Sequence, residues 1–271
     1  MLLCFIACKN DTENEELSYE PFEHIQLIAH GGDCINCPQN TMPAFESAVN
    51  NLGLHWIETD PQLTKDGVFV LFHDNTLSSY MSGEVKDYDF DELLEIDFAY
   101  PEKFGKKYSG TKICTAEQAI SFCKKNNVIL EFDFGHFEVN IENVQKLWNL
   151  VCKYDYKNGV IFEPYNEIHL KTILSVSNEP NIIYVGCDKN LDIPELLRQF
   201  KFVVIGLNYL KVGTETDLAT KIHDFGYKAA SSVINPVPEN SIEKLNELID
   251  MGFDYIYVGS IPYSAIKTKT E

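Results

Sequence analysis

Two carboxylates, a tight turn and a histidine follow one another in the segment WIETDPQLTKDGVFVLFHD. Glu58 and Asp60 are separated by one residue, so on a β-strand their side chains point to the same face. Residues 64–67, Thr-Lys-Asp-Gly, predict a hairpin, because Asp-Gly accepts the positive φ of a type I′ turn. Folding the flanking strands together sets His73 opposite Asp60 or Glu58, depending on register. A histidine beside two carboxylates is a set of groups suited to acid–base chemistry.

Polar residues also end other predicted strands. His30 ends the run HIQLIAH and is followed by a pair of glycines and a helix start. Glu131 and Asp133 repeat the i, i+2 spacing at the end of NVILEFDF. A single acid on a half-exposed strand is usually only solvated, but several strand ends carrying such groups predict one shared site. The carboxyl ends of parallel strands are where barrel enzymes place their chemistry.

The elements that must position these residues follow from the spacing of the apolar runs. Short β-rich runs recur at 24–30, 55–60, 68–74, 127–134, 159–164, 181–186, 201–206, 228–234 and 253–259. Amphipathic segments separate most of them, and NTMPAFESAVNNLG is the clearest helix, with Asn40 or Thr41 as its cap and Gly53 as its stop. Alternation of this kind predicts a (β/α)₈ TIM barrel over residues 21–271, with residues 75–126 as an insertion after the second barrel strand.

Composition excludes several classes of protein. The chain has 271 residues, 41 acidic against 22 basic side chains, and a formal net charge of −19. Such a balance argues against binding to nucleic acid, which requires a basic face, and against attachment to anionic lipid through a basic patch. No apolar run reaches the roughly 18 residues of a membrane-spanning helix.

The N-terminus, MLLCFIACKNDTENEE, resembles the end of a bacterial lipoprotein signal, with Cys8 as the site of a lipid anchor. Residues 1–20 are therefore expected to be a signal remnant and an acidic tether, and the protein to be exported and held at a membrane; a cytoplasmic protein is the alternative. In an exported protein a local disulfide between Cys34 and Cys37 is one outcome. No second cysteine pair or suitable histidine spacing accompanies them, so a zinc site is not indicated.

From about residue 25 to residue 260 the chain resembles the glycerophosphodiester phosphodiesterase family. The motifs that carry the resemblance are His30 and Gly32 with PQNT (38–41), IETDPQLTKDG (57–67) and FHD (72–74). The segments YMSGEVKDYDFDELLEID and CTAEQAISFCKKNNVILEFD follow in the family's order. The resemblance implies a (β/α)₈ barrel with a small insertion over its mouth.

The resemblance also implies the chemistry. It implies a divalent cation, Ca²⁺ or Mg²⁺, held by Glu58, Asp60 and Glu131, which suits the preference of these cations for oxygen ligands. It implies that His30 and His73 act as acid and base, without indicating which is which. The implied substrate is a glycerophosphodiester, hydrolysed to glycerol 3-phosphate and an alcohol.

Two departures from the family concern the phosphate. Gly31 stands where the family usually has arginine, and Asp133 where it usually has lysine, so two positive charges are missing. Lys189 and His136, which follow strand ends, are candidate replacements, and Asp133 itself is expected to face the substrate. Three functions remain open: an active glycerophosphodiesterase, a catalytically weak relative that binds a ligand or a metal, and a phosphodiesterase of the same fold that acts on a phospholipid headgroup.

Overall fold

The computed structural model describes residues 25–177, 180–187, 190–207, 217–233 and 242–266. The predicted signal remnant, the anchor at Cys8 and Lys189 therefore lie outside the described residues. No described helix is both long enough and apolar enough to cross a bilayer.

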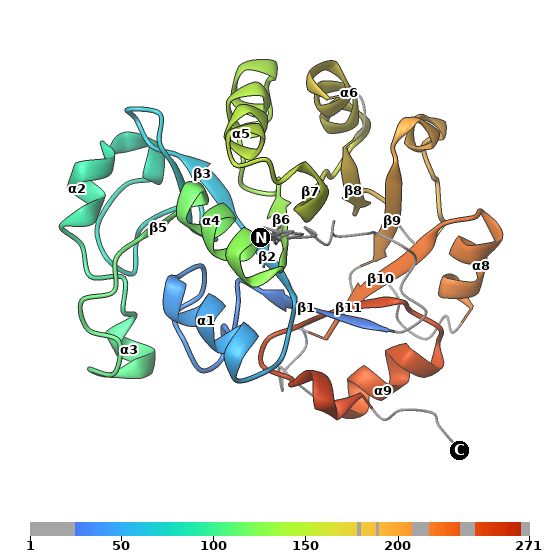
Figure 1. Ribbon diagram of the computed structural model, residues 1–271, viewed down its shortest axis with the longest axis horizontal. Coiled ribbons are helices and arrows are strands. Elements are labelled where there is room, and N and C mark those ends of the chain that lie inside the picture. Colours follow the sequence, from blue (N-terminus) through green and yellow to red (C-terminus); the bar gives the residue numbers. More distant parts are fainter. Residues whose placement is uncertain (1–24, 178–179, 188–189, 208–216, 234–241, 267–271) are drawn as a thin grey trace, which may run out of the picture.

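Eight parallel strands close into a barrel, which confirms the predicted fold (Figure 1). Their order around the barrel is β1 (Gln26–His30), β11 (Tyr255–Val258), β10 (Lys228–Ser232), β9 (Phe202–Leu207), β8 (Asn181–Tyr184), β7 (Val160–Glu163), β6 (Ile129–Asp133) and β2 (Trp56–Thr59). The closing contact joins β1 to β11, with Gln26 beside Tyr255 and Ala29 beside Val258.

Helices surround these strands in Figure 1. They are α1 (Met42–Asn50), α4 (Ala116–Asn126), α5 (Ile141–Lys153), α6 (Glu167–Val176), α8 (Leu218–Asp224) and α9 (Ile242–Asp250), and the 3₁₀ helix η3 (Glu195–Gln199) follows β8. Short 3₁₀ turns also occur at η2 (Lys157–Gly159) and η4 (Tyr263–Ala265). Thr41 is the N-cap of α1, but its hydroxyl donates to the carbonyl of Pro38 at 2.5 Å, so its side chain forms no capping bond.

The barrel interior is filled in layers. The lower layer takes one residue from each strand and forms its own apolar cluster: Ile28, Trp56, Ile129, Ile161, Ile183, Val204, Ala230 and Tyr255. Because side chains alternate along a strand, the residues two positions further on also point inward. This upper layer consists of His30, Glu58, Glu131, Glu163, Val185, Gly206, Ser232 and Tyr257. The period of two thus places the polar residues together at the carboxyl end of the strands.

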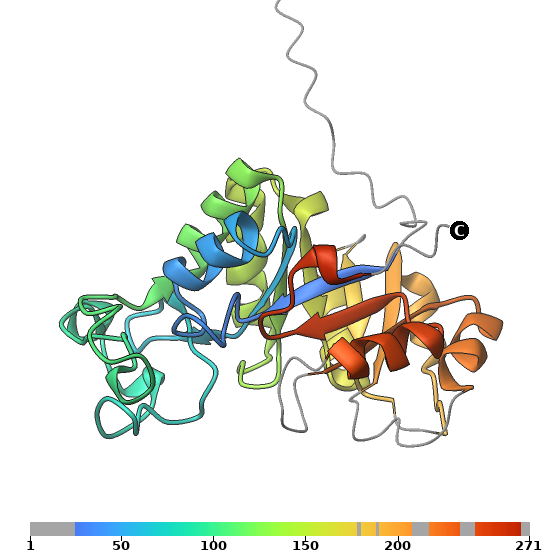
Figure 2. The same cartoon turned by 90° about the horizontal axis from the view of Figure 1, so that it is seen from below.

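The insertion leaves the barrel after β2 and projects to one side of it (Figures 1 and 2). It contains an antiparallel sheet of β3 (Pro61–Leu63), β4 (Phe69–Leu71) and β5 (Cys114–Thr115), together with η1 (Val85–Asp87), α2 (Phe90–Leu94) and α3 (Pro101–Phe104). The hairpin β3–β4 is part of this sheet, whereas α4 packs beside β6 like the other barrel helices. The extra segment therefore starts earlier and ends earlier than 75–126.

The hairpin is antiparallel as predicted, but two details differ. Gly67 has a φ of 87°, whereas Asp66 does not have a positive φ, so a type I′ turn is excluded. The bonds Gly67 N to Thr64 O and Thr64 N to Val68 O instead describe a type I turn followed by a glycine bulge. Pro61 pairs with Leu71, and Phe72 N donates to Asp60 O, so Phe72 rather than His73 lies opposite Asp60.

Candidate active site

A cavity of about 340 Å³ opens at the carboxyl end of the barrel. All residues of the upper interior layer except Glu131 line it, and His73, Asp133, His136 and Tyr165 complete its wall. The carboxyl ends of all eight barrel strands and the segment after β4 therefore converge on one space. Among the described residues that line this cavity there is no lysine or arginine.

Three carboxylates meet in this mouth. One oxygen from each of Glu58, Asp60 and Asp133 lies within 4.8 Å of the others. Glu58 Oε2 accepts the Gly31 N–H at 3.0 Å, but the buried Glu58 Oε1 has no hydrogen-bond partner. Within the described part of the chain, none of these three acids is paired with a lysine or arginine, and one of them has an oxygen without a hydrogen-bond partner. Such a set of carboxylate oxygens is what a hard divalent cation requires. The group can hold a metal ion.

Asp60 is oriented by Asn40. Asn40 Nδ2 donates to Asp60 Oδ2 at 2.7 Å, and the Asp60 N–H donates to Asn40 Oδ1 at 3.2 Å. Asn40 has a φ of 59°, a left-handed conformation that asparagine tolerates better than most residues. The PQNT motif therefore contributes a positioning residue for the second carboxylate.

Glu131 lies below the mouth and is held by other partners. Its Oε2 accepts the Trp56 Nε1–H at 2.8 Å, and its Oε1 accepts the Tyr257 hydroxyl at 2.6 Å. Asp133, two residues further along the same strand, is the third carboxylate of the cluster, while Glu131, the ligand that the resemblance implies, pairs with Glu58 in the barrel register. Asp133 Oδ2 accepts the Tyr165 hydroxyl at 2.9 Å.

Burial and the proximity of other acids raise the proton affinity of Glu58 and Asp133. Burial, followed by the charges of Asp60 and Asp133, raises the pKa of Glu58 well above its ordinary value. Burial, followed by the charge of Asp60, raises the pKa of Asp133 to about 7. A bound cation would attract each of these carboxylates and so offset their mutual repulsion. The electrostatics of the site therefore favour binding of a cation.

Glu163 is a member of the site that sequence reasoning did not identify. It lies 3.0 Å from the Tyr257 hydroxyl, which also donates to Glu131. One hydroxyl has a single proton, so both contacts are satisfied together when Glu163 is protonated and donates. Burial raises the pKa of Glu163 well above its ordinary value, which agrees with this assignment. Its inward position, two residues after Ile161, was the available signal.

The histidines form a row across the mouth. The ring centroids of His30 and His73 are 6.0 Å apart, and those of His73 and His136 are 5.2 Å apart. His30 Nε2 lies 3.9 Å from Glu58 Oε2, at the deep end of the row. His73 Nδ1 is 2.9 Å from Asp74 Oδ1, which leaves Nε2 available, and His136 Nδ1 is 2.9 Å from Asn75 Oδ1.

The two predicted catalytic histidines have different electrostatic surroundings. Burial lowers the pKa of His30 to about 4, despite the opposing charge of Asp60. Burial would also lower the pKa of His73, but the charges of Asp60 and Asp74 outweigh it and raise that pKa above its ordinary value. His30 is therefore neutral at physiological pH, and His73 holds a proton more strongly than His30 does.

Gly31 could not be replaced by the family's arginine without rearrangement. Its φ is 60°, and a Cβ at this position would lie 2.1 Å from Cγ of Gln39. The glycine also brings its N–H to Glu58, as described above. The missing positive charge at residue 31 therefore follows from the backbone conformation of the β1–α1 loop.

Cys34 and Cys37 in the same loop are not joined by the disulfide considered from the sequence. Cys37 Sγ lies 3.1 Å from the Tyr108 hydroxyl, and Cys34 Sγ lies 3.7 Å from the carbonyl oxygen of Gly259. These contacts connect the loop to the insertion and to the end of β11.

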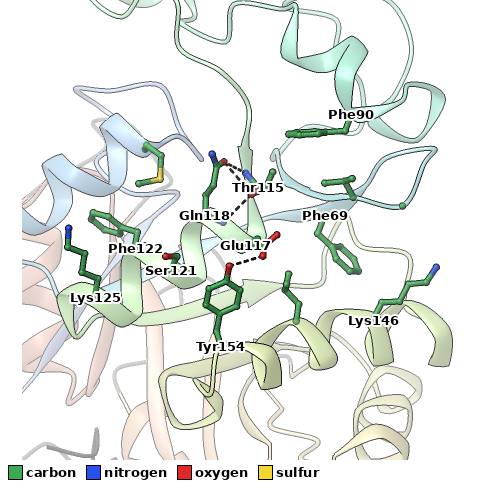
Figure 3. Close-up of a pocket in the computed structure, with 14 residues that line it drawn as sticks. Phe69, Phe90, Thr115, Glu117, Gln118, Ser121, Phe122, Lys125, Lys146 and Tyr154 are labelled. Atoms are coloured by element: carbon green, nitrogen blue, oxygen red, sulfur yellow. Dashed lines mark hydrogen bonds between the residues drawn. The ribbon is translucent and has the colours of Figure 1, made fainter. Parts of the chain in front are cut away.

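A larger cavity, of about 900 Å³, lies on the outside of the barrel between α4, α5 and the hairpin (Figure 3). The polar groups drawn there are engaged in local structure: Glu117 accepts the Tyr154 hydroxyl at 2.7 Å, and Thr115 and Gln118 form the capping box of α4. The described residues lining it include no histidine and only one acid. The chemistry belongs to the barrel mouth.

Comparison with known proteins agrees with this assignment. The model of the glycerophosphoryl diester phosphodiesterase family matches residues 30–155. A glycerophosphodiester phosphodiesterase of Caldanaerobacter subterraneus is 33% identical over 150 residues, which cover 54% of this chain and 60% of the relative. Human glycerophosphodiester phosphodiesterase 1 is 30% identical over 145 residues, covering 52% of this chain and 43% of the relative. The matches thus span about half the length of these relatives.

A solved structure extends the likeness in fold to most of the chain. The phosphodiesterase of Oleispira antarctica in complex with the product sn-glycerol-3-phosphate superimposes with a TM-score of 0.74 at 21% identity, covering 89% of this chain and 96% of that one. The sequence match over residues 30–155 includes His30, Glu58, Asp60, His73 and Asp133, which the barrel brings together in its mouth. Over residues 30–155 the chain is therefore similar in sequence to the glycerophosphoryl diester phosphodiesterase family.

Proposed function

We propose that this protein is a metal-dependent phosphodiesterase that hydrolyses glycerophosphodiesters to glycerol 3-phosphate and an alcohol. The observation that carries the proposal is a cavity lined by His30, His73, Glu58 and Asp133, with Asp60 in contact range of the last two carboxylates. The names of the relatives support the substrate class, and the product named for the Oleispira structure supports glycerol 3-phosphate as the part retained.

The cation of this proposal is Ca²⁺ or Mg²⁺, since the candidate ligands are all carboxylates. Glu58, Asp60 and Asp133 would hold it, and Glu131 would support them from below through Trp56 and Tyr257. When bound, the cation neutralises and polarises the phosphoryl oxygens. That contribution matters here because the described lining of the mouth has no basic side chain other than histidine.

The histidines would move the protons. His30, being neutral, takes the proton of a glycerol hydroxyl as that oxygen attacks phosphorus and the bond to the alcohol breaks. His73, held by Asp74 through Nδ1, gives its proton to the departing alkoxide. Water then opens the resulting cyclic phosphate with the two histidines in reversed roles. Each transfer of this kind typically contributes about 10²–10⁴-fold to the rate.

Activity should require the cation and should appear as release of glycerol 3-phosphate. We expect purified protein to hydrolyse glycerophosphodiesters, to lose activity with a chelator and to regain it with added Ca²⁺ or Mg²⁺. The measurement is coupled detection of glycerol 3-phosphate over a panel that also contains a phospholipid. A protein that binds the cation but releases no alcohol from any substrate would be a binding protein instead. If the protein released an alcohol only from the phospholipid, its substrate would be a membrane lipid.

Export and anchoring at Cys8 remain a proposal that rests on residues 1–8 of the sequence. Recovery of the protein in the membrane fraction, and its loss from that fraction on Cys8→Ser substitution, would support it. Lys189 also remains a proposed phosphate ligand on sequence grounds. His136 is a better supported candidate, because it lines the mouth beside His73.

The raised pKa of Asp133 predicts how stability depends on pH. Folding raises this pKa to about 7 from an ordinary value near 4, so the folded state binds the proton more tightly than the unfolded chain. The stabilisation is present at low pH and is lost as the pH rises through about 7. The melting temperature of the cation-free protein should therefore fall between about pH 4 and about pH 7 and level off above about pH 7.

The Asp133→Asn variant should lose most of this decline, because asparagine does not titrate. Saturating Ca²⁺ should also remove it in the wild-type protein. Asp91→Asn, on the exposed surface of α2, is the matched control and should retain the wild-type slope. Thermal melts across this pH range make the measurement, and an Asp133→Asn slope equal to that of wild type would show that another group titrates.

A further inference from the structure

A second cavity, of about 220 Å³, lies next to the mouth and shares His73 with it. One wall is the β1–α1 loop, represented by Cys34 and Gln39. The other wall is the insertion, represented by Tyr80, Tyr100 and Lys103. Because His73 borders both spaces, a substrate whose phosphate lies at the carboxylates can extend past His73 into this second cavity.

The insertion is fixed against the loop by specific bonds. Lys103 Nζ donates to the carbonyl oxygen of Cys34 at 3.0 Å, and the Tyr108 hydroxyl donates to the carbonyl oxygen of Asn36 at 2.7 Å. Aromatic contacts continue the wall, with ring centroids 6.5 Å apart for Tyr80 and Tyr100 and 6.2 Å apart for Tyr100 and Phe104. These contacts hold the two walls of the cavity, the insertion and the β1–α1 loop, against each other.

Lys103 is distinctive in its charge. Among the described residues that line either cavity, it is the only lysine or arginine. The Lys103 ammonium donates to a neutral carbonyl, whereas Asp74, the acid of this cavity, is hydrogen-bonded to His73. A lysine ammonium has three donors, so one bond to Cys34 leaves capacity for a ligand. The second cavity therefore presents a positive charge to whatever enters it.

We propose that the second cavity is the subsite for the leaving alcohol, and that Lys103 makes it selective for alcohols that carry a negative charge. The inference rests on the proposed function and adds the substrate class. His73 is the group that protonates the departing alkoxide, so the alcohol must lie on its side of the phosphate. An anionic group on that alcohol would meet Lys103, and a quaternary ammonium group would be repelled by it.

Three diesters of glycerol 3-phosphate that differ only in the charge of a small alcohol test the proposal: glycolate, ethylene glycol and choline. We expect kcat/KM of the wild-type protein to be highest for the glycolate diester and lowest for the choline diester. Lys103→Ala should reduce the glycolate-to-choline ratio about tenfold, the effect of losing a hydrogen bond between charged groups. Lys103→Glu should reverse the order, and high salt should weaken the wild-type preference.

Lys106→Glu is the matched control. It makes the same change of charge in the same part of the insertion, at an exposed residue that does not line the cavity, and should leave the ratio unchanged. A uniform rise in KM for all three diesters in Lys103→Ala would overturn the inference, because the lysine would then bind the phosphate. A ratio unaffected by either Lys103 variant would also overturn it while leaving the proposed function intact. A wild-type protein that binds the cation but is inactive toward every diester would instead remove the proposed function.

Discussion

Glu58→Gln should abolish cation binding and lower kcat/KM about a thousandfold while leaving the barrel folded. Glutamine keeps the size of the side chain and an acceptor for the Gly31 N–H. It removes the negative charge of the Glu58 carboxylate, one oxygen of which has no hydrogen-bond partner among the described residues. Polarisation of phosphoryl oxygens by a cation contributes several kcal/mol, and each 1.36 kcal/mol corresponds to a factor of ten. The cation-free variant should be more stable than the cation-free wild type, because one crowded buried acid has been neutralised.

Calorimetric titration with Ca²⁺ and Mg²⁺, together with thermal melts, makes the measurement. Glu46→Gln, at an exposed position of α1, is a control for the loss of one negative charge. We expect the control to bind the cation as wild type does and to gain a similar increase in melting temperature from it. A Glu58→Gln variant with wild-type affinity would show that the cation lies elsewhere in the mouth.

The second large effect concerns the histidines. His30→Ala and His73→Ala should each lower kcat about 10²–10⁴-fold toward a diester of an ordinary alcohol. The two variants should differ when the leaving group is p-nitrophenol, which departs without a proton. His73→Ala should then recover most of its activity, because the acid is no longer needed, whereas His30→Ala should remain impaired.

This comparison separates the roles without relying on either pKa. His55→Ala, at an exposed position before β2, should behave as wild type with both leaving groups. If p-nitrophenol restored His30→Ala instead, the base and acid would be interchanged. Equal impairment of both variants with both leaving groups would mean that neither acts on the departing oxygen.

Much of this site was predictable from spacing alone. Glu58 and Asp60 share one strand face, and His30 ends the first strand, so a closed barrel necessarily brings them to one rim. The nine apolar runs correspond to the eight barrel strands and to β4 of the hairpin. A barrel of this kind can be predicted from sequence because each strand is buried on both faces and appears as a short continuous apolar run. Helical segments between these runs then indicate a parallel sheet.

The residues that were missed share a physical reason. Glu163 precedes a proline and resembles a loop acid, while Trp56 and Tyr257 resemble apolar core residues. Their role depends on bonds across the barrel, between strands that are distant in sequence, as in Trp56 Nε1 to Glu131 Oε2. Local sequence patterns carry no information about such partners. The bonds that Glu131 accepts from Trp56 and Tyr257 could therefore not be predicted from the sequence either.

The hairpin illustrates a smaller failure of the same kind. Asp-Gly is compatible with a type I′ turn and with a type I turn followed by a glycine bulge, since both need a glycine at positive φ. The bulge adds one residue to the connection and shifts the pairing, so Phe72 rather than His73 lies opposite Asp60. His73 still reaches the mouth because it lies one residue beyond the last pair of the hairpin.

Closure of the barrel between β1 and β11 has a consequence during synthesis on the ribosome. The acids of the cation cluster and all three histidines of the mouth precede residue 140, but β11 and its Tyr257 are synthesised after all of them. Without β11 the other barrel strands would form an open sheet with β1 and β10 as its edges, and the Tyr257 hydroxyl that contacts both Glu131 and Glu163 would be missing. Barrel closure must therefore wait for β11, and a chain truncated before β11 would contain these acids without the closed barrel that assembles them.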